Sequence, residues 1–176
     1  MKKSIILFSL LIASGNCFAG EIHEAVIKDR LDEVKRLIEK EKFDVNAKEK
    51  KYYDETPLHL ARKKDIAEYL IKKGAIVNAK NKYSETPLQV TLGLMRNLSY
   101  ANEEPKLQKL KEIAATLIKH GANIGDLEEM IKDIKREIKW LQSKRETSKK
   151  IEYYKKLHKD LKNFLIETKA QHGSTK

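Results

Sequence analysis

The stretch Thr56-Pro57-Leu58-His59-Leu60-Ala61 decides the fold of this chain, because an altered copy of it recurs one repeat later. The second copy reads Thr-Pro-Leu-Gln-Val at residues 86–90. A Val-Asn-Ala-Lys segment precedes each copy, and a Gly-Ala pair follows each one. Self-similarity with a period of roughly thirty residues is typical of stacked repeats. The sequence therefore predicts a repeat solenoid rather than a single globular core.

The motif also predicts where helices begin and end. Thr56 suits an N-cap, because its side chain can accept from free backbone N–H groups, and Pro57 suits the first helical position, where no N–H is needed. Gly74 can end the returning helix, since glycine adopts the left-handed conformation without steric cost. The same structural roles are expected in the next copy for Thr86, Pro87 and Gly121. We therefore expect an all-α fold built from helix pairs.

Three segments together resemble the ankyrin repeat: Thr-Pro-Leu-His-Leu-Ala, the Ile-Ala-Glu-Tyr-Leu-Ile helix at 66–71, and Gly-Ala-x-Val-Asn-Ala at 74–79. The resemblance covers residues 21–125. It implies a β-turn finger and two antiparallel helices in each repeat, with the fingertips and first helices lining a concave protein-binding surface. It also implies that the side chain of His59 hydrogen-bonds to tie a finger to a helix.

Departures from the pattern define the expected domains. The second repeat is about three residues short, which predicts clipped helices, and the third is swollen by a polar stretch that predicts a loop. The fingers at 48–55 and 80–85 have Asp54 and Ser84 where the family has glycine. The chain divides into a signal peptide at 1–19, ankyrin-like repeats at 20–125 (a capping repeat at 21–48, repeat 2 at 49–80, and repeat 3 at 81–125 with the insertion at 95–106), a helical hairpin at 126–168 and a disordered tail at 169–176.

The C-terminal third shows two amphipathic stripes separated by a polar break. Apolar residues recur at helical spacing from Leu127 to Leu141 and from Ile151 to Leu165, with Asp126 placed to cap the first helix. Two such helices fold back as a hairpin, which could cover the apolar edge of the last repeat. A dimerising coiled coil is the rival interpretation. The oligomeric state stays open at this stage.

The first nineteen residues have the layout of a secretory signal. Lys2 and Lys3 precede a short apolar run, and small residues at Cys17 and Ala19 suit cleavage before Gly20. We therefore expect an exported protein, periplasmic or secreted. Lipidation of Cys17 is the alternative.

Motifs for catalysis or cofactor binding are lacking in the sequence. His23-Glu24 begins like a zinc helix, but Ile27 stands where the second histidine is needed. No glycine-rich phosphate loop and no nucleophile elbow is present. We therefore expect a non-enzymatic protein with no catalytic, cofactor-binding or metal-binding residues.

The fingers are the predicted binding site. Exposed tyrosines give large contact area at low entropic cost, and lysines beside them would attract an acidic surface. We therefore expect another protein to bind at the fingers. The predicted partner-binding residues are Lys51, Tyr52, Tyr53, Lys82 and Tyr83. The alternative, that the rings pack along their own fingers, remains open here.

The basic C-terminal third suggests a second function. Residues 127–176 contain 14 basic and 8 acidic residues, within a chain of net charge +11. Lysines on an amphipathic hairpin, with Trp140 beside them, could bind an anionic membrane surface or another polyanion. Export argues against nucleic acid as the partner, and no recognition motif for it is present.

Overall fold

The computed structural model describes residues 19–98, 104–144 and 148–173, and over these ranges the chain is helical with no β-strand. The predicted signal peptide therefore lies outside the described residues, apart from Ala19. The helices are α2 (Ala19–Ile27), α3 (Leu31–Glu39), the 3₁₀ turn η2 (Lys50–Tyr52), α4 (Pro57–Leu60), α5 (Lys64–Lys72), α6 (Pro87–Leu98), α7 (Glu104–Lys119), α8 (Gly125–Ser143) and α9 (Ser148–Gly173).

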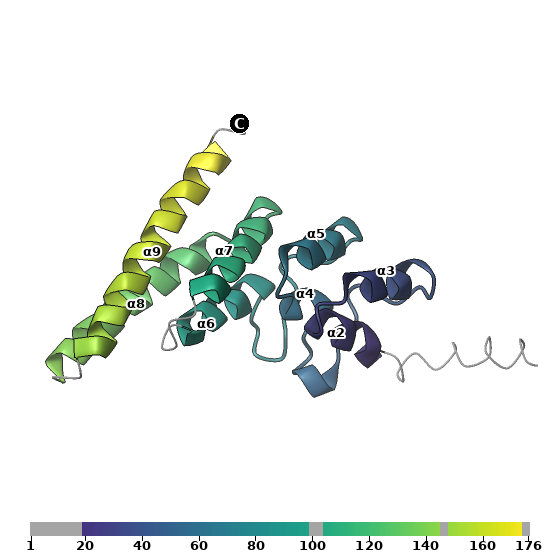
Figure 1. Cartoon of the computed structure of the whole chain (residues 1–176), viewed down its shortest axis with the longest axis horizontal. Coiled ribbons are helices and arrows are strands. Elements are labelled where there is room, and N and C mark those ends of the chain that lie inside the picture. The colour runs from purple at the N-terminus through teal and green to yellow at the C-terminus, as the bar shows by residue number, and fades with distance from the viewer. Residues whose placement is uncertain (1–18, 99–103, 145–147, 174–176) are drawn as a thin grey trace, which may run out of the picture.

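Helix pairs follow one another in chain order and form a stack. Figure 1 shows the pairs side by side, from α2 and α3 through α4 with α5 and α6 with α7 to α8 and α9. One continuous apolar cluster runs through the stack, and it includes fully buried side chains from every pair, such as Leu37, Leu70, Leu117 and Leu161. Burying one such side chain contributes about 1.5–3 kcal/mol. The predicted all-α solenoid with a C-terminal hairpin is confirmed.

The returning helices of repeats 2 and 3, α5 and α7, end on a glycine in the same way. Gly74 and Gly121 have φ angles of +93° and +95°. The N–H of the next residue then donates back into the last turn, from Ala75 to Leu70 O at 3.0 Å and from Ala122 to Leu117 O at 2.9 Å. A side chain at either glycine would be strained in this backbone region. The predicted helix ends at these two positions are confirmed.

The first helices of repeats 2 and 3 differ threefold in length. α4 has 4 residues and α6 has 12. The short α4 agrees with the clipped helix expected for repeat 2. The polar loop predicted at 95–106, however, is wrong at both ends, because residues 95–98 belong to α6 and 104–106 to α7; only 99–103 lie outside the described residues.

Packing explains why the insertion is largely helical. Met95 is fully buried at the inner face of α6, and Leu107 and Leu110 are buried on α7. Apolar burial at helical spacing stabilises the added turns in spite of the polar residues between them. The lengthened helices give the hairpin a surface to rest on, and Arg96 at the end of α6 lies 3.8 Å from Glu137 of α8.

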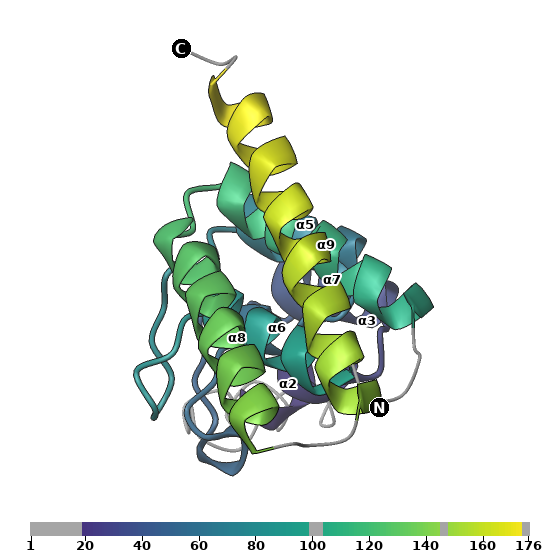
Figure 2. The same cartoon turned by 90° about the vertical axis from the view of Figure 1, so that its left-hand side faces the viewer.

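The two C-terminal helices lie antiparallel, side by side in both views (Figures 1 and 2). α9 continues to Gly173, so the predicted tail is wrong over residues 169–173, which are helical. Thr168 and Phe164 are still buried near this end, which supports the last turns. Residues 174–176 lie outside the described part. Among the described helices, none combines the length and the apolar character that crossing a bilayer requires.

Candidate functional site

The first finger (residues 48–55) is closed by an unusual backbone. An isolated antiparallel bridge pairs Glu49 with Glu55, and η2 fills the space between them. Tyr53 and Asp54 then take the left-handed conformation, with φ angles of 56° and 57°. Few non-glycine residues adopt this region, although aspartate does so more readily than most. The turn directs consecutive side chains to different sides of the finger.

The second finger (residues 80–85) is held by one buried amide. Asn81 accepts hydrogen bonds at Oδ1 from the N–H groups of Tyr83 and Glu85, both at 2.9 Å. Ser84 takes a φ angle of 61°, so the left-handed position that the family fills with glycine is left-handed here too. The finger therefore has a fixed shape in the absence of glycine.

One side chain in each repeat links its first helix to the next unit of the stack. His59 accepts from the backbone N–H of Thr56 at 3.1 Å through Nδ1, and its Nε2 donates to the main-chain oxygen of Glu85 at 3.1 Å. His23 does the same for the first repeat, donating from Nε2 to Glu55 O at 2.9 Å. The structural role predicted for His59 agrees with this geometry, whereas the equivalent role of His23 was missed.

Repeat 3 makes the last of these links with an amide. Gln89 accepts from the N–H of Thr86 at 2.9 Å, and its Nε2 donates to the carboxylate of Asp126 at 3.2 Å. The hydroxyl of Thr86 reaches the same carboxylate at 3.4 Å. Asp126 is the second residue of α8, and its carboxylate accepts hydrogen bonds from repeat 3. The prediction that Asp126 caps this helix is wrong, because Ile124 occupies the cap position.

The repeated Val-Asn-Ala-Lys segment forms a second set of links. Asn46 donates to Gly74 O at 3.1 Å and accepts from the N–H of Ile76 at 2.8 Å. Asn78, one repeat later, donates to Gly121 O at 2.9 Å. Side-chain amides can donate and accept at once, which suits this bridging position. The repetition of the segment in the sequence was the available signal for this role.

Tyr52 is packed against the first repeat. Its ring stacks on the ring of buried His23, with centroids 5.7 Å apart, and its hydroxyl donates to Glu24 at 2.5 Å. This hydrogen bond, followed by those from Lys28 and Lys51, lowers the pKa of Glu24 from 4.5 to about 2. Tyr52 therefore packs on the first repeat, which is neither an open position for a partner nor packing along its own finger.

Tyr53 and Tyr83 form an exposed aromatic pair, which we call the fingertip pair. Their ring centroids are 5.5 Å apart, and the side chains are 55% and 60% exposed. The two fingers are joined beneath the rings, because the N–H of Lys82 donates to Tyr53 O at 2.8 Å. The pair therefore combines residues from two repeats on one firm support.

The two predicted lysines have different surroundings. Lys51 lies 3.3 Å from Glu24, and its amine sits 5.1 Å from the centre of the Tyr52 ring. Lys82 is exposed and forms no ion pair with any residue that the structure describes. The charge available beside the fingertip pair thus comes from Lys82 more than from Lys51.

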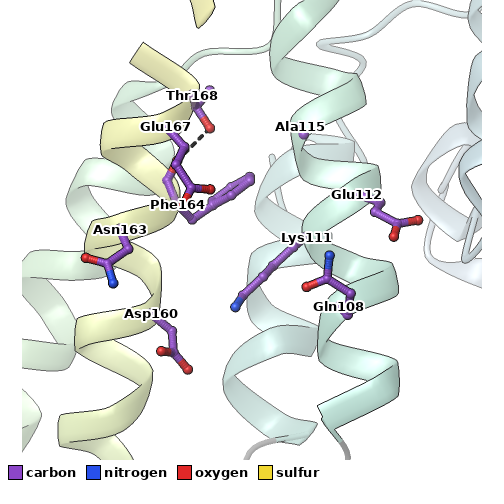
Figure 3. Close-up of a pocket in the computed structure, with 9 residues that line it drawn as sticks. All are labelled: Gln108, Lys111, Glu112, Ala115, Asp160, Asn163, Phe164, Glu167 and Thr168. Atoms are coloured by element: carbon purple, nitrogen blue, oxygen red, sulfur yellow. Dashed lines mark hydrogen bonds between the residues drawn. The ribbon is translucent and has the colours of Figure 1, made fainter. Parts of the chain in front are cut away.

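A separate groove of about 410 Å³ lies between α7 and α9. Figure 3 shows Lys111 from α7 and Phe164 from α9 entering the gap, with Asp160 and Glu167 along its α9 side. None of the predicted site residues lines it. Over the described residues no cluster of three or more His, Cys, Asp or Glu side chains is arranged to hold a metal ion.

Comparison with known proteins agrees with the repeat geometry. The family model described as ankyrin repeats matches residues 22–128 in three copies. The chain is also similar to alpha-latrocrustotoxin-Lt1a of Latrodectus tredecimguttatus, with 40% identity over 91 residues, which is 46% of this chain and only 6% of that toxin. The family match covers more than half of the sequence and coincides with the fingers, helix pairs and side-chain links described above. This chain belongs to the ankyrin repeat family.

Proposed function

We propose that this protein binds a partner protein through the fingertip pair of Tyr53 and Tyr83. Ankyrin repeats are generally non-enzymatic protein–protein interaction modules. The observation behind the proposal is the side-by-side exposure of these two rings, in contrast to the packed ring of Tyr52. Exposed tyrosines are enriched among the residues that dominate binding energy at interfaces.

The firm support of the pair favours tight binding. The hydrogen bond from Lys82 to Tyr53 and the amide of Asn81 fix both fingers before a partner arrives. A surface that is already ordered loses less conformational entropy on association. Side chains on the concave face beside the fingers would add area to the contact.

Charge beside the pair favours an acidic partner surface. Lys50, Lys80 and Lys82 are exposed on the two fingers, although Asp54 and Glu85 lie close in sequence and reduce the local excess. Exposed lysines at the rim of an interface act mainly on the rate of association, and salt screens them. Lys82→Gln should therefore slow association at low salt and leave dissociation unchanged.

Site-specific photocrosslinking would test the proposal. A photoreactive phenylalanine analogue is placed at position 83 in one protein and at position 140 in a second, since Trp140 is similarly exposed, at 51%, but lies on α8. Each protein is incubated with cell-envelope fractions and with whole-cell lysates. We expect a crosslinked partner at position 83 that is absent at position 140.

Measuring the affinity of variants for the identified partner then tests whether the rings of Tyr53 and Tyr83 contribute to binding. Tyr53→Ala with Tyr83→Ala should weaken binding about tenfold or more, in line with losses at central aromatic contacts. Trp140→Ala is the matched control and should leave affinity unchanged. Equal affinity of the double variant and the parent protein would reject the proposal.

We also propose that the protein is exported by its first nineteen residues, with cleavage before Gly20. N-terminal sequencing of protein recovered from periplasmic and culture fractions would test this. A start at Gly20 supports cleavage there, while a blocked, lipid-modified start at Cys17 that disappears in Cys17→Ser would support the lipid-anchored alternative.

A further inference from the structure

The outer edge of the hairpin has a row of basic side chains on each helix. On α8, Lys135 and Lys139 are one turn apart, and on α9, Lys155, His158 and Lys162 fall on one face by the same helical spacing. We call this group the outer seam. Its four lysines are exposed and His158 is half-buried.

An ion pair at one end fixes the two rows against each other. Lys169 of α9 lies 2.6 Å from Glu128 of α8. Glu128 precedes Lys135 by seven residues and Lys169 follows Lys162 by seven, so each lies two turns along the same row. Burial first, then repulsion from Lys162 and Lys135, lowers the pKa of His158, which agrees with the two rows meeting there.

The lysines of the seam differ from their neighbours on α8 in their ion pairing. Within the described ranges, Lys135, Lys139, Lys155 and Lys162 form no ion pair. Beside this row on α8, by contrast, Lys132 and Arg136 both pair with Glu129, and Arg136 pairs with Asp133 as well. Unpaired like charges held close together destabilise a fold, so the seam is a feature that packing alone does not require.

We propose that the outer seam binds a linear acidic polysaccharide, one chain wide, along the hairpin. Lysine acts as a point charge without the forked geometry of arginine, which suits a ligand recognised by charge density. Two packed helices lie about 8–10 Å apart, so the seam is a narrow strip rather than a plane.

The surroundings of the seam favour a single chain over a membrane or a duplex. Carboxylates border it, with Glu128 at one end and Glu152 one turn before Lys155. A flat anionic surface would approach these carboxylates together with the lysines, whereas one extended chain can follow the lysines alone. Trp140 falls on a different face of α8 from Lys135 and Lys139 by helical spacing, so it adds no apolar anchor to the seam.

Binding of a sulfated heparin octasaccharide to the full chain, measured at several salt concentrations, tests the proposal. Lys135→Gln with Lys162→Gln should weaken binding about tenfold and reduce the slope of log Kd against log salt by about 2. Lys72→Gln with Lys119→Gln is the matched control, because it removes the same net charge from exposed lysines on α5 and α7, and it should weaken binding less than twofold.

The seam variant should keep or raise its melting temperature, since it removes repulsion from exposed positions. Equal losses in the two double variants would show that only net charge matters and would overturn the proposal, as would no binding by the parent protein. Seam-dependent binding that is tighter to phosphatidylserine vesicles, or to a duplex DNA of equal charge, than to the octasaccharide would also overturn it.

Discussion

The finger edge of the stack and the C-terminal helix pair are joined to their neighbours by different interactions. Along the finger edge, His23, His59 and Gln89 each reach the next unit by hydrogen bonds. Along the hairpin, apolar side chains such as Leu127 and Leu161 are buried between helices. Hydrogen bonds fix which atoms meet, and apolar burial supplies most of the free energy. The position of each finger relative to the neighbouring repeat is therefore fixed by specific hydrogen bonds.

Removing a large apolar side chain should give the largest effect. Leu70→Ala in α5 and Leu161→Ala in α9 each delete a fully buried leucine, at an expected cost of about 2–5 kcal/mol in unfolding free energy. We expect both variants to shift one common urea transition, because the hairpin rests on α6 and α7. Circular dichroism follows the whole chain, and Trp140, the single tryptophan, reports on the hairpin. Two separate transitions would show that the regions unfold independently.

Cutting one link at the finger edge should cost less. His59→Ala leaves the N–H of Thr56 and the main-chain oxygen of Glu85 without this hydrogen-bond partner. We expect this loss to lower the unfolding free energy by about 2 kcal/mol. His59→Gln should cost about half as much, on the order of 1 kcal/mol, because Gln89 accepts from Thr86 in the same way in repeat 3. Urea unfolding measures both variants. Equal destabilisation by Ala and Gln would contradict the hydrogen-bonding role.

Protonation of His59 at acid pH should lower the unfolding free energy by less than the His59→Ala substitution does. Burial lowers the pKa of His59 below its ordinary value of 6.5, so the unfolded chain binds the proton more readily. The stability from neutral His59 is complete above pH 6.5 and is lost as the pH falls below that value. Protonation removes acceptance at Nδ1 but leaves the bond to Glu85, which limits the loss.

The unfolding free energy at pH 7.5, 6.5 and 5.5 tests this dependence. His59→Gln should show a smaller decline over this range than the parent protein. His158, whose pKa is lowered chiefly by burial, should contribute a remaining decline in the same direction in both proteins. An unchanged decline in His59→Gln would contradict the assignment.

The smallest stability effect is expected at the fingertip pair. Tyr53→Ala and Tyr83→Ala should each change the unfolding free energy by less than about 0.5 kcal/mol, as exposed substitutions usually do. Tyr52→Ala should cost about 1–2 kcal/mol, because it removes the stack on His23 and the hydrogen bond to Glu24. Thermal melts of the three variants compare them directly. Similar losses in all three would remove the distinction between Tyr52 and its neighbour.

The sequence predicted those features that depend on local geometry. Thr56, Pro57, Gly74 and Gly121 act at helix ends through their own backbone preferences, so the short motif was sufficient to assign them. The length of α6 could not be read in this way. It depends on burial of Met95 against elements from other parts of the chain, while the polar residues nearby suggested a loop.

The candidate site was predicted only in part. Tyr52 and Tyr53 are identical neighbours in the sequence, and only the left-handed turn at Tyr53 separates a packed ring from an exposed one. His23 was missed because no Thr-Pro pair precedes it, although it lies about one repeat before His59. Both cases depend on contacts between repeats, and the residues of a single repeat do not predict such contacts.

The carboxylate of Asp126 has a consequence for how this stack can change length. His23 and His59 bond to main-chain oxygens, which any inserted finger would also offer. Gln89 and Thr86 instead bond to the side chain of Asp126, at the start of a helix that has no finger. A duplicated copy of residues 49–80 would therefore find compatible partners on both sides if it were placed beside repeat 2. A copy placed after residue 125 would instead separate Gln89 and Thr86 from Asp126, so both hydrogen bonds to that carboxylate would be lost.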